Sequence, residues 1–163
     1  MLKRILVLIL TLSIAFSLFS CEGEKKFTCA DLTLTLPSSY REEDGGESAN
    51  MLLTDGKSTV SIKRLSIIDA EAQGINSSYS DRQFAEFFLI NSDIDGVVSV
   101  YSDVPYYTYY DTTGGARLFC LAAFYRTPYA YFIVIFATSS DREREARDEF
   151  FEIITSATYQ IVN

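Results

Sequence analysis

The chain has 163 residues, 48% of them hydrophobic, and its 22 acidic and 14 basic residues give a net charge of −8. The absence of histidine excludes Ser-His-Asp and Cys-His catalysis and histidine-ligated zinc or haem. The acidic balance opposes nucleic-acid binding, which requires a basic face to displace counterions from phosphates. We therefore expect neither a nucleic-acid partner nor a cofactor.

The first twenty residues have the pattern of an export signal. Lys3 and Arg4 are followed by the apolar run Ile5–Phe16, and Leu18-Phe19-Ser20-Cys21 closes the segment. This ending resembles the lipobox of bacterial lipoproteins. The resemblance implies that residues 1–20 are a lipoprotein signal peptide and that acylated Cys21 anchors the protein in the lipid bilayer. The protein would then be extracytoplasmic, attached to the bacterial cell membrane.

A plain secretory signal and an uncleaved anchor are the alternatives for this segment. The anchor is disfavoured, because the apolar run over residues 5–19 is shorter than the roughly 20 residues that a spanning helix needs. After cleavage, residues 21–26 would be the lipidated cysteine and a charged tether, and residues 27–163 a single domain. Without Lys3 and Arg4 the net charge becomes −10. Such a charge favours a cationic or neutral partner over an acidic one.

The first part of the domain has the patterns of strands and turns. Leu32–Leu36 alternates apolar and polar residues, as a strand with one buried face does. Tyr40–Ala49 is polar and contains Gly-Gly, which predicts a loop. Asn50–Thr54 and Lys57–Ser66 flank an Asp-Gly pair at residues 55–56, which predicts a β-hairpin with a two-residue turn.

Two capping boxes predict helices. Ser80 to Gln83 is followed by phenylalanines at helical spacing, so residues 81–91 are expected to form a helix whose apolar stripe faces a sheet. Ser140 to Glu143 is expected to open a second helix that extends to about Ser156.

The segments between these helices are rich in strand-forming residues. Val97–Tyr101 and Tyr106–Thr112 are predicted strands, with Pro105 between them. Arg117–Tyr125 and Tyr129–Thr138 are apolar on both faces. Strands of that kind lie at the centre of a sheet that is covered on both sides.

This order of strands, helix, strands and helix resembles the PsbP-like fold, the family of the oxygen-evolving-complex P protein, which many small bacterial lipoproteins resemble too. The resemblance rests on Leu32-Thr-Leu-Thr-Leu-Pro-Ser-Ser-Tyr40, the Asp55-Gly56 hairpin, the helix after Ser80 and the closing Ile153-Ile154-Thr-Ser-Ala157. It implies an α+β fold with a largely antiparallel sheet of six to seven strands and helices on both faces. Cystatin-like and nuclear-transport-factor-like folds are the alternatives, but both usually place a long helix before the sheet.

Tyrosine is concentrated within residues 101–131. Tyr106, Tyr107, Tyr109 and Tyr110 place it on both faces of one predicted strand. Exposed tyrosines favour protein interfaces and also stack on sugar rings, so these four are the candidate binding residues for a protein or glycan partner. The alternative is that tyrosine serves here only as a good strand former at the rim of the sheet.

Two further patterns suggest covalent or metal chemistry. Cys29 and Cys120 would form a disulfide if they are neighbours in an oxidising compartment, or else pack as buried thiols. Asn91, Asp93 and Asp95 match the first half of a calcium-binding EF-hand loop. Ser102 stands where the bidentate acid belongs, so we expect a polar turn and no metal.

These observations predict a binding or scaffolding module at the cell envelope, because they include no catalytic signature. The alternative is a hydrolase of envelope material that uses only Asp and Glu. A hydrolase would need two carboxylates that converge in a cleft, whereas a binding module needs an exposed aromatic patch.

Overall fold

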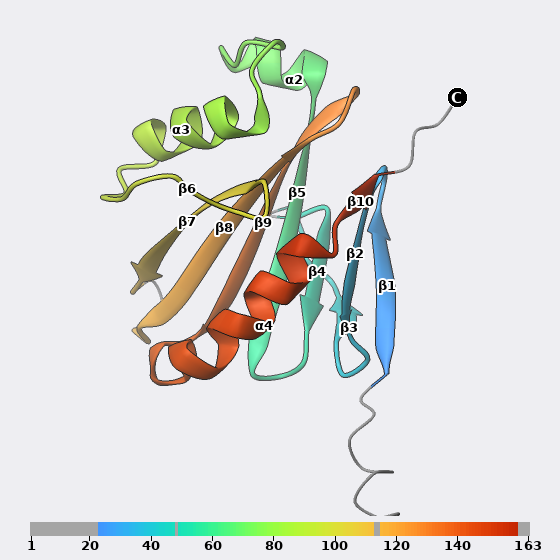
Figure 1. The fold of residues 1–163 in the computed structure, drawn as a ribbon, viewed down its shortest axis with the longest axis vertical. Helices are drawn as coiled ribbons and strands as arrows, with labels where there is room; N and C mark the ends of the chain where they lie inside the picture. Colours follow the sequence, from blue (N-terminus) through green and yellow to red (C-terminus); the bar gives the residue numbers. More distant parts are fainter. Residues whose placement is uncertain (1–22, 48, 113–114, 160–163) are drawn as a thin grey trace, which may run out of the picture.

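The computed structural model describes residues 23–47, 49–112 and 115–159; the signal segment and Cys21 lie outside them. Its main element is an antiparallel sheet of seven strands (Figure 1). In spatial order the strands are β3 (Arg41–Glu43), β4 (Met51–Thr54), β5 (Ser58–Ser66), β9 (Ala130–Ser139), β8 (Leu118–Arg126), β7 (Val104–Asp111) and β6 (Ser99–Tyr101).

A second sheet of three strands stands on the side of the molecule opposite β7 (Figure 1). It contains β1 (Glu24–Cys29), β2 (Leu32–Pro37) and β10 (Thr158–Tyr159). The predicted strand at Leu32–Leu36 is therefore confirmed, but it belongs to this smaller sheet. The boundary predicted between a tether at residues 21–26 and a domain from residue 27 is wrong, because Glu24 already pairs with Pro37 in the β1–β2 ladder.

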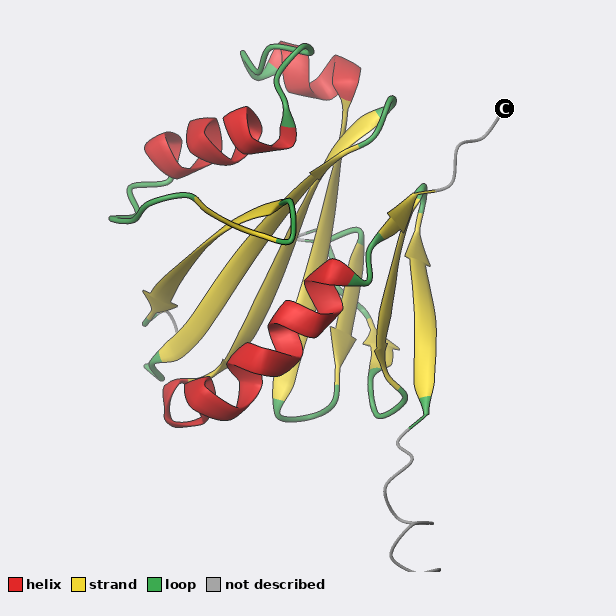
Figure 2. Cartoon of the chain, in the orientation of Figure 1, coloured by secondary structure: helices red, strands yellow, loops and turns green. Residues whose placement is uncertain are grey.

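Helices cover both faces of the seven-stranded sheet (Figure 2). On one face lies α4 (Glu143–Thr155), which also contacts β2; on the other lie α2 (Ile67–Ala72) and α3 (Asp81–Asn91). The central strands β8 and β9 are buried on both faces, as their sequences predict. Phe119 and Leu121 belong to the core under α4, whereas Phe124 belongs to the core under α3.

The two predicted capping boxes differ in outcome. At α3 the box forms, since the Ser80 hydroxyl accepts from Gln83 N–H and the Gln83 side chain accepts from Ser80 N–H. At α4 it does not form, and a 3₁₀ turn, η1 (Ser140–Arg142), precedes the helix. The physical reason is that Ser140 N–H still donates to the Arg117 carbonyl, which holds Ser140 in the β8–β9 ladder.

Two predictions on either side of β4 are corrected. The polar loop after Tyr40 contains β3, whose Glu43 pairs with Leu52. The hairpin between β4 and β5 has a four-residue loop, because Thr54 pairs with Thr59 and the Asp55 carboxylate accepts both Lys57 and Ser58 N–H.

Pro105 lies within β7 and not between strands. It sits opposite Val100, next to a two-residue turn at Ser102 and Asp103 whose φ angles are 46° and 69°. Positive φ at both positions is the geometry of the tight hairpin turns that match the twist of β-strands. A strand can accommodate the proline here because the ladder between β7 and β8 begins only at Tyr106, so Pro105 removes no ladder hydrogen bond.

One buried ion pair links the smaller sheet to the larger. Asp31, in the turn between β1 and β2, is 8% exposed at its side chain and lies 3.6 Å from Arg64 Nε of β5. Neither carboxylate oxygen of Asp31 has a hydrogen-bond partner among the described residues. Removal of Arg64 would leave that charge buried and uncompensated.

Among the described helices none is long and apolar enough to cross a membrane.

Candidate binding cleft at the edge of β7

A cleft of about 540 Å³ lies where β7 runs along the rim of the sheet. Three segments that are distant in sequence contribute to it: the loop after α3, the strands β7 and β8, and the start of α4. The lining residues are Asp93, Ile94, Asp95, Thr108, Tyr109, Tyr110, Phe119, Glu143 and Arg147. The cleft therefore unites the tyrosine-rich strand with the acidic pair of the EF-hand-like segment.

Tyr110 is held in the cleft by a charged network on the α4 face. Its hydroxyl donates to Glu143 Oε2 at 2.5 Å, and Arg147 Nη2 donates to Glu143 Oε1 at 2.5 Å. The Arg117 guanidinium lies 4.0 Å from the centroid of the Tyr110 ring, a cation–π distance. Tyr110 remains 47% exposed, so its ring is both oriented and available to a ligand.

The network also sets the ionisation of Glu143. The hydrogen bond from Tyr110, followed by the one from Arg147, lowers the pKa of this carboxyl below its usual 4.5, and the same bond raises the pKa of Tyr110. A general acid in hydrolysis needs a carboxyl whose pKa is raised. Glu143 is therefore held as a carboxylate, the form that accepts the hydrogen bonds of Tyr110 and Arg147.

The four candidate tyrosines are divided between the two faces of β7, because side chains alternate along a strand. Tyr106 packs under α4 against Phe151, with ring centroids 5.2 Å apart. Tyr107 points to the α3 face and is only 2% exposed, with its ring centroid 5.5 Å from that of Phe124. The expectation that Tyr107 contributes to a binding surface is therefore wrong: it is a core residue.

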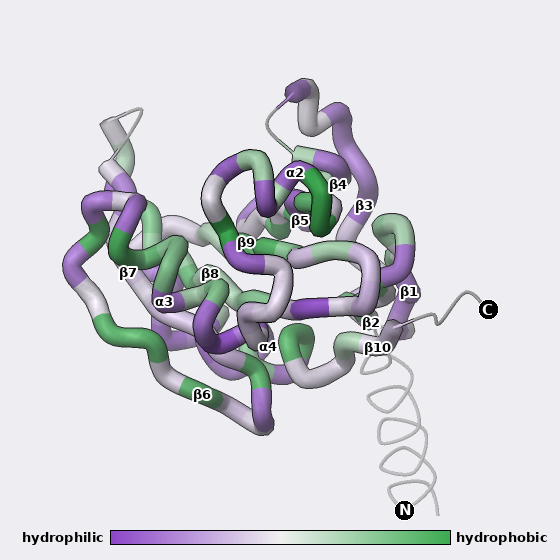
Figure 3. Tube along the Cα trace, turned by 90° about the horizontal axis from the view of Figure 1, so that it is seen from above, coloured by the Kyte–Doolittle hydropathy of each residue, from purple (hydrophilic) through white to green (hydrophobic). Residues whose placement is uncertain are grey.

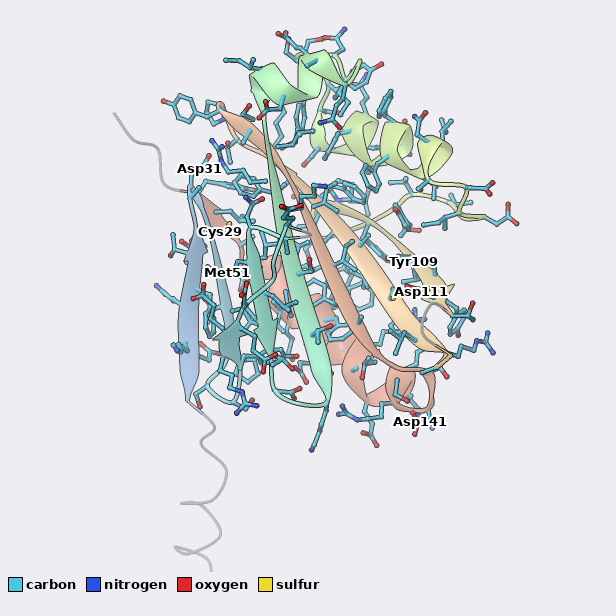
Figure 4. The ribbon with its side chains drawn as sticks, turned by 180° about the vertical axis from the view of Figure 1, so that it is seen from behind. Cys29, Asp31, Met51, Tyr109, Asp111 and Asp141 are labelled. Atoms are coloured by element: carbon cyan, nitrogen blue, oxygen red, sulfur yellow. The ribbon has the colours of Figure 1, made fainter. Side chains whose placement is uncertain are left out.

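Tyr109 shares the α3 face and is half-buried beside Tyr107. Burial raises the pKa of its hydroxyl, and the neighbouring Cys120 raises it further. Of the four tyrosines, Tyr109 and Tyr110 line the cleft. Figure 4 shows Tyr109 and Asp111 at one end of the molecule and Cys29 and Asp31 at the other, beside the smaller sheet.

Two of the three EF-hand-like residues line the cleft, and the three do not form a metal site. Asp93 and Asp95 are exposed and line it, whereas the Asn91 amide donates to the Phe87 carbonyl of its own helix. Among the described residues no group of three or more His, Cys, Asp or Glu side chains could hold a metal ion. The side chains of Asp93 and Asp95 have no hydrogen bond or ion pair with any described residue.

The two cysteines are not bonded. Both are free and buried, and they lie in different layers: Cys29 in the core under α4, Cys120 opposite Tyr109 on the β7–β8 ladder, facing α3. A disulfide between them is therefore excluded by their positions. Burial raises the pKa of each thiol, which makes both poor nucleophiles.

Several residues of the cleft carry no strong signal in the sequence. Glu143 and Arg147 are four residues apart, a spacing that indicates a helix-surface ion pair and nothing more. Their contact with Tyr110, 33 residues earlier, arises only from the packing of α4 against the sheet. Arg117 and Phe119 are likewise brought to the site by the pairing of β7 with β8.

No protein-family model and no curated protein matches the sequence. Solved structures do match the fold. A protein of Bacteroides thetaiotaomicron VPI-5482 has a TM-score of 0.60 at 13% identity, over 86% of this chain and 50% of that one, so this chain spans half its length. Cyanobacterial PsbP (CyanoP) from Synechocystis sp. PCC 6803 has a TM-score of 0.53 at 13% identity, over 86% of this chain and 95% of that one.

The Ran-binding protein Mog1p of Saccharomyces cerevisiae also matches, with a TM-score of 0.51 at 7% identity, over 85% of this chain and 96% of that one. The chain has a PsbP-like fold. The fold-class prediction is thus confirmed in its main features, namely the antiparallel seven-stranded sheet and the helices on both faces. At such low identities the likeness concerns the fold alone.

Proposed function

We propose that this protein is a lipid-anchored, extracytoplasmic binding module that captures a protein partner at the cell envelope through the cleft beside β7. The observation that carries the proposal is the oriented but half-exposed ring of Tyr110, held by Glu143 and Arg117 at a cleft of about 540 Å³. Tyrosine in such a position offers a large, stiff and amphipathic contact surface. Mog1p, which shares the fold, is named as a Ran-binding protein.

The anchor part of the proposal rests on the lipobox-like Leu18-Phe19-Ser20-Cys21. Because β1 begins at Glu24, only two residues would separate acylated Cys21 from the folded domain, a span of roughly 10 Å. The smaller sheet would then lie next to the bilayer. In Figure 1 the strand β7, which carries the cleft, lies on the side of the molecule opposite β1, and in Figure 4 the labelled Tyr109 lies opposite Cys29.

The anchor is tested by Cys21→Ala. We expect the variant to leave the membrane fraction, because a protein without acyl chains has no anchor in the bilayer. Carbonate-resistant membrane association of the variant would contradict the lipoprotein assignment.

The cleft is tested by placing a photo-crosslinking phenylalanine analogue at Tyr110 in cells. The matched control is the same analogue at Tyr129, which has almost the same exposure (48% against 47%) but lies in the turn between β8 and β9. We expect a discrete protein adduct from position 110 and none from position 129. A carbohydrate adduct would identify a glycan partner instead, and equal labelling at both positions would refute the assignment of the cleft.

A further inference from the structure

The direction in which each backbone group of β7 points follows from the hydrogen-bond pattern of the sheet. In an antiparallel pair, residues that exchange both backbone bonds alternate with residues that exchange none. Thr127 N–H donates to the Ala130 carbonyl and Ser140 N–H to the Arg117 carbonyl, so the odd-numbered residues of β8 bond to β9. The even-numbered residues of β8 therefore bond to β7.

This result determines which residues of β7 point outward. Tyr107 pairs with Ala122 and Tyr109 with Cys120, so both point their backbone groups toward β8. Thr108 and Tyr110 must then point theirs away from β8. The two-residue hairpin at Ser102 and Asp103 leads independently to the same phase, because the residues flanking such a turn form a bonded pair, Tyr101 with Val104.

The outward groups of Thr108 and Tyr110 have no strand beside them. The ladder between β6 and β7 ends at Ser99 and Tyr106, and no other strand of the described residues pairs with β7 on that side. Each residue presents one donor and one acceptor. An open row of such groups is a template for an additional strand.

Charge at the cleft selects the kind of segment that would fit. Asp93 and Asp95 are exposed, line the cleft and make no ion pair with the described residues, whereas Glu143 is already paired with Arg147. The unpaired charge among the residues that line the cleft is therefore negative, and it outnumbers the single positive charge of Arg117 over the Tyr110 ring. A second copy of the chain would bring the same carboxylates and a net charge of −8, so repulsion opposes self-pairing.

We propose that β7 is extended by an added strand, supplied by a basic, extended segment of the protein partner. The segment would exchange backbone hydrogen bonds with Thr108 and Tyr110 and place a Lys or Arg side chain near Asp93 and Asp95. This recognition mode obtains affinity from main-chain bonds and specificity from alternate side chains. It rests on the proposed function, because it names the partner of the same cleft.

The test uses a fluorescein-labelled peptide, acetyl-Lys-Val-Lys-Thr-Lys-Val-Lys-amide, and its binding to the purified chain measured by anisotropy. Thr108→Pro removes an outward N–H without removing a bond to β8, so the variant should fold. We expect it to bind the peptide about tenfold more weakly or worse. The matched control is Glu42→Pro, which removes an outward N–H from β3 at the opposite edge and should bind as wild type.

Charge is tested by the double variant Asp93→Asn/Asp95→Asn against Glu71→Gln/Glu152→Gln, which removes two exposed charges elsewhere. Only the first pair should weaken binding, by about fivefold at low salt and less at high salt. Peptides with N-methyl groups at alternate amides test the edge without altering the protein. One N-methyl register should abolish binding and the other should leave it intact.

The strand-addition proposal is overturned if Thr108→Pro binds as wild type, if both N-methyl registers bind equally, or if the glutamate analogue of the peptide binds as well. A dimer in ultracentrifugation that Thr108→Pro dissolves would overturn it in favour of self-pairing. These failures are separate from a failure of the proposed function. A protein adduct at Tyr110 with an unaffected Thr108→Pro variant would keep the cleft and reject only strand addition.

Discussion

The two ends of the seven-stranded sheet differ in how their edges are protected. At one end β3 consists of Arg41, Glu42 and Glu43, all exposed, and its outward backbone groups belong to a glutamate. At the other end Thr108 and Tyr110 present the outward groups of β7, and both side chains favour strands. Charged residues on an edge strand oppose pairing with another chain. The two edges therefore differ in charge: β3 carries three charged side chains, whereas Thr108 and Tyr110 of β7 carry none.

The ends also differ in what holds them to the core. The β7 end depends on aromatic packing on the α3 face, where Tyr107, Phe84 and Phe124 meet, the last two with ring centroids 5.6 Å apart. The β3–β4 end depends on aliphatic residues such as Leu53 and on the smaller sheet beside it. The edge strand that carries the cleft thus packs on a cluster of aromatic rings. Figure 3 shows hydrophobic and hydrophilic residues interspersed along the chain around β6, next to this end.

The largest expected effect follows from removal of that aromatic support. Phe124→Ala should destabilise the protein by about 3–5 kcal/mol, because it opens a cavity beneath β7. Urea unfolding measures the loss, and hydrogen exchange should show faster exchange of the Tyr107 and Tyr109 amides. Leu53→Ala, at the other end, should cost about 2–5 kcal/mol without selectively loosening β7. Equal effects of both variants on the β7 amides would remove this distinction.

A smaller effect is expected from the ion pair that links the smaller sheet to β5. Arg64→Met should destabilise the protein by about 1–3 kcal/mol, since it leaves the Asp31 carboxylate buried without a charged partner. Adding Asp31→Asn should recover part of the loss, because the uncompensated charge is then absent. Chemical denaturation of the single and double variants measures both values. A double variant less stable than the single one would show that Asp31 has another role.

The protection of the β3 edge can be removed directly. The triple variant Arg41→Thr/Glu42→Tyr/Glu43→Thr gives β3 the side-chain types of β7, and we expect concentration-dependent self-association. Sedimentation velocity should show a rise in average mass toward that of a dimer. Arg41→Lys/Glu42→Asp/Glu43→Asp keeps the charges and should remain monomeric. A monomeric triple variant would mean that charge is not what closes this edge.

The smallest effect concerns Glu143 and acid. Because the pKa of Glu143 is lowered in the folded state, its hydrogen bonds with Tyr110 and Arg147 stabilise the protein fully above pH 4.5 and are lost as the pH falls through the lowered pKa. Glu143→Gln should therefore reduce stability by less than about 1 kcal/mol at neutral pH, since the pair is partly exposed, 25% at Glu143 and 41% at Arg147, and solvent screens it. Melting temperatures of the variant and the wild type should begin to approach each other below pH 4.5 and should converge once the pH is below the lowered pKa of Glu143. A difference that persists in acid would contradict an ionic origin.

Local patterns predicted the elements whose formation depends on neighbours in the chain. The capping box at Ser80 and Gln83 correctly bounded α3, and the doubly apolar composition of residues 117–138 correctly predicted the central strands. Errors arose where a distant partner decided the outcome. The second capping box does not form, because Ser140 N–H donates to the Arg117 carbonyl. The polar segment after Tyr40 contains β3, because Arg41 and Glu43 pair with Thr54 and Leu52 of β4.

The candidate site shows the same difference between what local patterns predict and what distant contacts decide. The tyrosine pattern indicates β7 as a candidate binding strand. The alternation of side chains along a strand places the four tyrosines on two faces. Tyr107 is buried because its ring packs against Phe124. Tyr110 is fixed at the surface because its hydroxyl donates to Glu143, which is 33 residues later in the chain. Sequence spacing could not determine whether Cys29 and Cys120 form a disulfide, because that depends on the layers of the fold in which the two thiols lie.

The sequence by itself determined the acidity of the protein, the absence of histidine chemistry, the export signal as a prediction, and the identity of the central strands and of α3. All of these depend on composition or on contacts within a few residues. The tertiary structure alone decided which strand edges are open and which carboxylates stand beside them, because an edge is defined by the order in which strands pair across the whole sheet. Part of the net charge of −8 lies beside the open edge of β7, where Asp93 and Asp95 make no ion pair with the described residues.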